Sequence, residues 1–282
     1  MTIAACTHRH PIRRLVDGVG LVLGLIFAVG ASGHAWAGSL DEIRARGFMI
    51  VGTKADYQPF GFRNDTGTIV GFEPDLAAEI AKALGVSLKL VPVVATTRVT
   101  MLQSGELDLV IATMNVTPER RKQVDFVEPS YYASGVNVLA LKSAHLHVWQ
   151  ELRDKPACSV EGSFYLPELK ERYGIELHTY KDTDQVYAAV RAGECVGVYD
   201  DAAIIGQLQK PEWRDYEMPF RSVMLQPWGM AVTPGNTDLA AFVGEAVKKW
   251  HAAGHIEELE KIWHIPPSVF AEEMHRRYGD AN

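Results

Sequence analysis

The sequence predicts an α/β protein with mostly parallel sheets. Two observations support this prediction: segments with the pattern of buried strands alternate with helical segments, and part of that pattern occurs twice. Residues 101–113 align with residues 189–201, because each stretch reads as a helix end, a glycine, a glutamate and a buried strand. A chain of 282 residues is long enough for two modest domains. We therefore expect two similar lobes.

The first half of the chain supplies the first cycle of elements. A strand at 48–52 precedes a helix at 74–84, whose apolar residues recur with helical spacing and whose end is followed by Gly85. The nearly continuous apolar run 107–112 is typical of a strand covered on both faces. Thr117 is expected to cap a short helix, because a proline and an acid follow it. The remaining elements are a strand at 87–94 and a short helix at 99–103.

The second half repeats the alternation after a connection with a helical turn at 142–153. The expected strands are 158–162, 176–180, 195–201 and 228–232, and the expected helices are 167–173, 185–192, 238–253 and 256–263. Ligands of parallel sheets bind outside the carboxyl ends of the strands. Thr113 and Asp201 each follow a repeated strand, so we expect them to face each other across a cleft between the lobes.

Several short motifs resemble those of a known family. They are V-T-P-E-R followed by V-D-F-V-E-P-S-Y-Y (116–132), G-T-K-A-D-Y-Q-P-F (52–60), G-F-E-P-D-L (71–76), L-Q-S-G-E-L-D (102–108) and Y-D-D (199–201). In order and spacing they resemble the extracytoplasmic solute-binding proteins of ABC transporters, in family 3, the branch that binds polar amino acids. The resemblance spans nearly the whole chain after residue 40.

The resemblance implies a periplasmic-binding-protein-like fold of type II, with two Rossmann-like lobes joined by a two-stranded hinge. Residues 38–140 would begin lobe 1, residues 141–227 would form an inserted lobe 2, and residues 228–282 would return to lobe 1. Two crossings permit closure around a ligand. The implied function is capture of a polar amino acid by a monomer and its delivery to an ABC transporter permease, without a cofactor and without catalysis.

An amino-acid site needs a cation for the ligand carboxylate and an acid for its ammonium. Arg120, in the first turn of a helix, is the expected carboxylate clamp, with Arg121 as the alternative. Asp201 is the expected ammonium partner, in preference to Asp200. The resemblance implies the same positions for the arginine and the acid.

Smaller groups are expected to complete the pocket. Thr113 and Asn115 end a buried strand and would add hydroxyl, amide and backbone contacts. The resemblance implies that Tyr57 forms an aromatic wall and that Ser163, beside a helix N-terminus, lies near the carboxylate.

Two positions depart from the family pattern. Relatives that bind basic side chains often have an acid where this chain has Lys54, so the cation favours a polar or acidic ligand. Arg98 also favours a polar or acidic ligand; the alternative is that Arg98 lies on a solvated helix face. Phe164 replaces a common threonine and would add an apolar wall.

The alternative function is that of a cyclohexadienyl or arogenate dehydratase-like enzyme, a class that resembles this family. In that branch the catalytic acid follows a G-T-x motif, and Tyr165 stands at the corresponding position. Glu161 and Glu168 flank the segment as substitutes. We expect a binding protein rather than an enzyme.

Residues 1–37 read as a secretory signal peptide. Three arginines precede an apolar run at 15–31, which is too short for an anchor, and Ala35-Trp36-Ala37 follows as a cleavage site. We therefore expect the mature protein in the periplasm.

Charge and cysteine content narrow the partners further. The chain carries −7 and residues 1–37 contribute three arginines and one aspartate, so the remainder carries −9 and nucleic acid is excluded as a partner. Cys158 and Cys195 remain after cleavage, and a disulfide is expected if their strands are neighbours; two buried thiols are the alternative. The histidine pairs His145/His147 and His251/His255 are read as exposed, and no metal site is expected.

Overall fold

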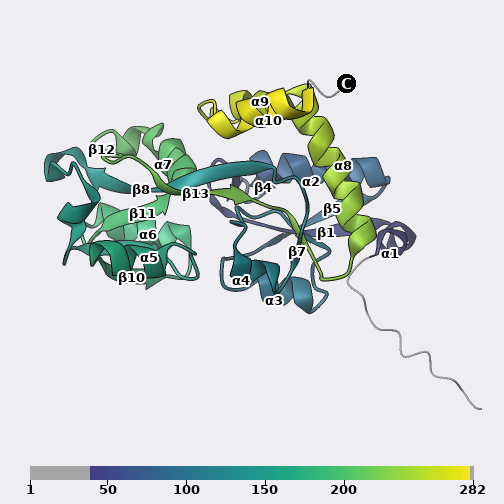
Figure 1. Ribbon diagram of the computed structural model, residues 1–282, viewed down its shortest axis with the longest axis horizontal. Helices are drawn as coiled ribbons and strands as arrows, with labels where there is room; N and C mark the ends of the chain where they lie inside the picture. The colour runs from purple at the N-terminus through teal and green to yellow at the C-terminus, as the bar shows by residue number, and fades with distance from the viewer. Residues whose placement is uncertain (1–38, 280–282) are drawn as a thin grey trace, which may run out of the picture. The chain divides into compact units, whose positions relative to one another are not determined.

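The computed structural model describes residues 39–279, so the predicted signal peptide lies outside the described residues. Within this range the chain forms two main sheets and a three-stranded small sheet. Figure 1 shows the main sheets with the helices around them. The predicted α/β class is confirmed, and each main sheet with its helices is called a lobe below.

The sheet of lobe 1 has the order β5-β1-β6-β14-β7. Its strands are β1 (Phe48–Thr53), β5 (Ser87–Pro92), β6 (Leu109–Val110), β7 (Asp125–Phe126) and β14 (Ala231–Val232). Strand β1 is parallel to β5 and β6, whereas β14, where the chain returns to the lobe, is antiparallel to β6 and β7. The run 107–112 is buried as predicted, but only its centre is a strand.

The helices of lobe 1 are α1 (Leu40–Arg46), α2 (Phe72–Leu84), α3 (Arg98–Gln103), α4 (Pro118–Arg121), α8 (Thr237–Ala253), α9 (His255–Ile262) and α10 (Val269–Gly279). The small sheet β2 (Asp56–Tyr57), β3 (Gly61–Arg63) and β4 (Ile69–Val70) lies between β1 and α2 in the chain. The sequence analysis did not predict α1, α10 or the small sheet. The small sheet is important for the site, because it carries Tyr57.

The sheet of lobe 2 has the order β10-β9-β11-β8-β12, and β13 also pairs with β8. Its strands are β8 (Tyr132–Leu141), β9 (Pro156–Val160), β10 (Glu176–Tyr180), β11 (Val196–Asp200), β12 (Tyr216–Glu217) and β13 (Val223–Trp228). Its helices are α5 (Leu166–Tyr173), α6 (Thr183–Arg191) and α7 (Asp201–Leu208), with short 3₁₀ turns η1 (Lys142–Ala144), η2 (Trp149–Leu152) and η3 (Pro211–Trp213).

The predicted internal repeat is visible in the backbone. Gly105 follows α3 and Gly193 follows α6, and both glycines have a positive φ, of 81° and 75°. Each glycine thus ends a helix in the left-handed conformation before a buried strand begins.

Strands β8 and β13 run side by side and lead from one lobe to the other (Figure 1). At one end Trp228 pairs with Tyr132, and both rings pack with Phe60 of lobe 1 at centroid distances of 4.9 and 5.4 Å. Residues 136–141 of β8 already pair with β11 and β12. The predicted boundary between the lobes, after residue 140, therefore stays a prediction. Because residues 136–141 already belong to the sheet of lobe 2, this strand pairing favours a boundary earlier in the chain.

Other sequence-based expectations have mixed outcomes. Cys158 and Cys195 form the expected disulfide, with Cα atoms 5.7 Å apart. His251 is fully buried, so its predicted exposure was wrong: it lies on the inner face of α8, and its Nε2 is 2.9 Å from the Ser130 carbonyl. No helix between residues 39 and 279 combines the length and apolar character needed to span a bilayer.

Candidate binding pocket

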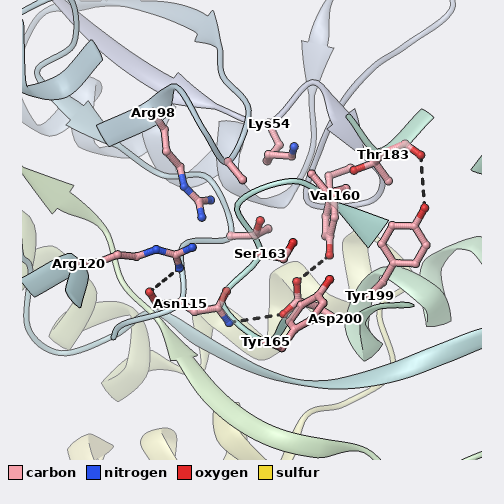
Figure 2. A pocket seen from close by; sticks show the side chains of 13 residues that line it. Lys54, Arg98, Asn115, Arg120, Val160, Ser163, Tyr165, Thr183, Tyr199 and Asp200 are labelled. Carbon is pink, nitrogen blue, oxygen red and sulfur yellow. Dashed lines mark hydrogen bonds between the residues drawn. The ribbon is translucent and has the colours of Figure 1, made fainter. Parts of the chain in front are cut away.

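The candidate site is a pocket lined by residues of both lobes, beyond the carboxyl ends of β1, β6, β9 and β11. Its cavity volume is about 30 Å³, room for roughly two water molecules. Six of the eight predicted ligand-binding residues line it, and Figure 2 draws the lining side chains as sticks. The lining residues are Lys54, Tyr57, Ala95, Arg98, Thr113, Asn115, Arg120, Val160, Ser163, Tyr165, Thr183, Tyr199 and Asp200.

Arg120 reaches the pocket from the short helix α4, which begins as the sequence predicts. The Thr117 side chain caps the helix by accepting the Arg120 N–H at 3.3 Å, and Pro118 occupies the first turn. The guanidinium donates to the Asn115 carbonyl at 2.9 Å and, across the lobes, to the Gly162 carbonyl at 3.2 Å. These two carbonyls fix the direction in which the cation points.

Asp200, not the predicted Asp201, lines the pocket. Asp200 ends β11 and its carboxylate points into the cavity, whereas Asp201 begins α7 and its carboxylate accepts from the Ser134 hydroxyl and from the Gly135 N–H at 3.1 Å. The prediction that Asp201 faces Thr113 across the cleft was wrong by one residue. The reason is that consecutive side chains at a strand end point in opposite directions.

The Asp200 carboxylate is held by groups of lobe 1. Its Oδ2 accepts from the Tyr57 hydroxyl at 2.9 Å, and its Oδ1 accepts a long bond of 3.5 Å from the Asn115 amide. Burial raises the pKa of Asp200 to about 6, against the lowering effect of the Tyr57 hydrogen bond. The pocket thus contains an acid whose ionised form would gain from a cationic partner.

Two further cations, Lys54 and Arg98, line the pocket beside Arg120. Figure 2 shows the guanidinium groups of Arg98 and Arg120 directed toward the same region. Arg98 is 3% exposed, so the alternative of a solvated helix face is wrong. Burial, followed by the nearby Arg120 charge, lowers the pKa of Arg98 to about 9. The Lys54 ammonium lies 2.8 Å from Asp56, which partly neutralises it.

A buried carboxylate that the sequence analysis missed supports this part of the pocket. Glu73, on α2, accepts the Thr113 N–H at 2.6 Å and the Tyr131 hydroxyl. Thr113 has a φ of 46°, an unusual conformation for a β-branched residue, so the Glu73 contact helps to hold a strained strand end. Burial raises the pKa of Glu73 to about 7. The acid in G-F-E-P-D-L was the available signal, but sequence alone does not show that it is buried.

The segment after β9 differs in detail from its prediction. Ser163 lines the pocket, and its N–H donates to the Val160 carbonyl at 3.3 Å, so this donor is not free for a ligand carboxylate. Tyr165 occupies the N-cap position of α5. Phe164 is not a lining residue: its ring packs against Tyr165 and the core of lobe 2, so the predicted apolar wall was wrong. Tyr165 itself lines the pocket instead.

Metal binding has no support in the part of the chain described, where no group of three or more His, Cys, Asp or Glu side chains is placed to hold an ion. Glu161 and Glu168, the substitutes considered for a catalytic acid, are both exposed and do not line the pocket.

The chain is similar in sequence and fold to several known proteins. The L-cystine-binding protein TcyJ of Escherichia coli K12 is 28% identical over 257 residues, which cover 90% of this chain and 96% of that protein. The P235GK mutant of the T. maritima protein ArgBP has a TM-score of 0.75 at 28% identity, covering 80% of this chain and 99% of that one. The ancestral amino acid-binding protein AncCDT-1, a precursor of cyclohexadienyl dehydratase, has a TM-score of 0.73 at 29% identity, with 80% and 99% covered.

The fold is therefore that of the type II periplasmic binding proteins, with two sheet lobes. Residues 49–266 match the model of one family within this class. The chain belongs to the bacterial extracellular solute-binding proteins, family 3.

Proposed function

We propose that this protein captures a polar amino acid, or a related small zwitterion, and delivers it to an ABC importer. One observation carries the proposal: Arg120 of lobe 1 and Asp200 of lobe 2 line the same pocket. The guanidinium would bind the ligand carboxylate, and the aspartate would accept from the ligand ammonium. Asn115 and Tyr57, which contact Asp200, would orient that acid.

The remaining charge of the pocket indicates the ligand side chain. Lys54 and Arg98 add two buried cations; Asp56 is paired with Lys54, and Glu73, whose pKa is raised to about 7, offsets the charge of Arg98 only in part. A second carboxylate or a strongly polar group on the ligand would offset the charge of Arg98, whereas a basic side chain would be repelled. An acidic amino acid is therefore the favoured ligand.

Ligand capture would require the lobes to separate and close again. Most of the residues that line the cavity are buried, so its walls are largely closed to solvent. Contacts across the lobes, such as Arg120 with Gly162 and Tyr57 with Asp200, characterise a closed arrangement. A ligand that contacts both lobes stabilises the closed state over the open one, which is a shift of population.

The cellular setting of the proposal follows from the sequence and from the family. Residues 1–37 would direct export to the periplasm, where the mature protein would act as a monomer and dock on an inner-membrane permease. No reaction is part of this function. Tyr165, at the position of the dehydratase acid, is a poor proton donor because burial raises its pKa.

A thermal-shift panel on the mature protein tests the proposal. The panel contains the amino acids, opines and small dicarboxylates. In a separate assay the protein is incubated with prephenate and with arogenate to test for dehydratase activity. A ligand that binds the native state raises the melting temperature. We expect the largest shift from a polar amino acid and no turnover of either substrate. Formation of phenylpyruvate or phenylalanine would instead establish the dehydratase.

A further inference from the structure

Asp56 contacts both lobes without lining the pocket. Its Oδ1 lies 2.8 Å from the Lys54 ammonium, within lobe 1, and its Oδ2 accepts the backbone N–H of Thr183, in lobe 2, at 2.8 Å. Lys54 and Thr183 are both lining residues, whereas Asp56 is not. The side chain of Asp56 is 12% exposed and that of Lys54 is 3% exposed. Charge-assisted contacts of this kind are stronger when they are shielded from water.

The Thr183 N–H belongs to the first turn of α6, where backbone donors have no partner within the helix. The helix is already capped once by its own chain, because the Asp182 side chain accepts the Gln185 N–H at 2.9 Å. Asp56 therefore adds a second acceptor and a negative charge at the positive end of the helix dipole, and it does so from the opposite lobe.

The local charges explain why Lys54 matters to this contact. Closure brings Asp56 near Asp182 and Asp184, and their like charges contribute, after burial, to a raised pKa of Asp184. The Lys54 ammonium offsets this repulsion, because it lies against Asp56 on the side of the pocket.

We propose that Asp56 is a positioning residue for ligand binding, which orients Lys54 at the pocket and fastens α6 of lobe 2 to lobe 1 on closure. The proposal rests on the proposed function for its effect on a ligand. Asp56 stabilises the closed state from outside the pocket, so its loss accelerates ligand release.

Two substitutions of Thr183 isolate the contact. Thr183→Pro removes the N–H at the first helical position, where proline is well tolerated, and Asp182 has the extended backbone, φ −140° and ψ 170°, that a following proline requires. Thr183→Ala removes the same hydroxyl and keeps the N–H, so it is the matched control. Each substitution is made both in the protein that keeps Asp56 and in the Asp56→Ala variant. Circular dichroism and melting curves check the fold of all variants.

The dissociation rate constant of the ligand found in the panel is measured by stopped-flow fluorescence. We expect Thr183→Pro to release the ligand about tenfold faster than Thr183→Ala when Asp56 is present. With Asp56→Ala the two should release it at equal rates, because the acceptor is gone. Equal rates in the presence of Asp56, or an undiminished difference in its absence, would overturn the proposal.

Small-angle scattering of the ligand-free proteins tests the role of Asp56 independently of the proposed amino-acid-binding function. We expect a larger radius of gyration for Thr183→Pro and Asp56→Ala than for Thr183→Ala. If the wild-type protein binds no amino acid, the proposed function fails, and the scattering alone decides the role of Asp56. Equal radii in that case would contradict the role as well.

Discussion

Asp200 and Asp201 are adjacent in the chain, yet their carboxylates contact different parts of the molecule. Asp200 accepts from the Tyr57 hydroxyl at 2.9 Å in the pocket, and Asp201 accepts from the Gly135 N–H at 3.1 Å on strand β8. The residue proposed to bind the ligand ammonium, Asp200, is thus the chain neighbour of Asp201, which fixes α7 to β8, a strand that links the lobes. This arrangement assigns the two acids separable roles.

Substitution of each acid should therefore give a different result. We expect Asp200→Asn to weaken ligand binding by roughly 100-fold, because the ligand ammonium loses its anionic partner, while the melting temperature changes little, because the asparagine oxygen can still accept from the Tyr57 hydroxyl. Asp201→Ala should lower the melting temperature, because the Ser134 hydroxyl and Gly135 N–H lose their acceptor. Calorimetry and thermal unfolding of both variants check this. The reverse pattern would restore Asp201 as the ligand contact.

Lys54 should influence which ligand is preferred. We expect Lys54→Met to reduce the affinity for glutamate about tenfold more than that for glutamine, because both ligands lose the charge that supports the Asp56 contact but only the acidic side chain also loses a cationic partner. Competition titrations with the two isosteric ligands measure the ratio. An equal loss for both would indicate that Lys54 acts on the fold of the pocket and not on ligand charge.

Ligand affinity should depend on pH through Asp200. Its pKa is raised to about 6 without ligand, and a bound ammonium would lower it, so protons compete with the ligand. We expect the affinity to be constant above about pH 7 and to fall as the pH drops below about 6, by up to about tenfold per unit. Calorimetric titrations across this range provide the test. An affinity that rises toward acid pH would argue against an ionised Asp200 in the complex.

Stability should depend on pH in the opposite sense through Glu73. Its folded pKa of about 7 lies above the ordinary value of 4.5, so between these values the folded state binds more protons than the unfolded state. Stability due to this group is therefore lost as pH rises through that window. We expect the free energy of unfolding to fall between about pH 5 and about pH 8 by roughly 2 kcal/mol more in the wild type than in Glu73→Gln. Urea titrations at both pH values measure this difference, and equal falls would show that Glu73 does not titrate in this range.

The sequence predicted the lining of the candidate pocket best where local signals and topology agree. Thr117, Pro118 and Arg120 form a capped helix start after a buried strand, and the capping and the position of Arg120 at the pocket were both found. The repeat located the end of β11, but periodicity does not decide which of two consecutive acids points inward. That choice depends on the exact residue at which the strand gives way to α7.

Arg98 and Glu73 were harder to predict because their charges suggest exposure. Each occupies a helix, and burial of either is acceptable only with partners that lie far away in sequence. For Glu73 these are the Thr113 N–H and the Tyr131 hydroxyl, and for Arg98 one of them is the Ala112 carbonyl. Such pairings follow from the packing of α2 and α3 against the sheet, which single-sequence patterns do not specify.

The central claim is that Arg120 of lobe 1 binds the carboxylate of a zwitterion whose ammonium lies at Asp200. The most direct measurement is a calorimetric titration of the amino acid found in the panel into Arg120→Ala, with Arg121→Ala as the matched control. Arg121 is half exposed and pairs with Glu128 at 2.8 Å, outside the pocket. We predict no measurable binding to Arg120→Ala, with its fold intact, and an affinity within about twofold of the wild type for Arg121→Ala. Near wild-type affinity in folded Arg120→Ala would contradict the account.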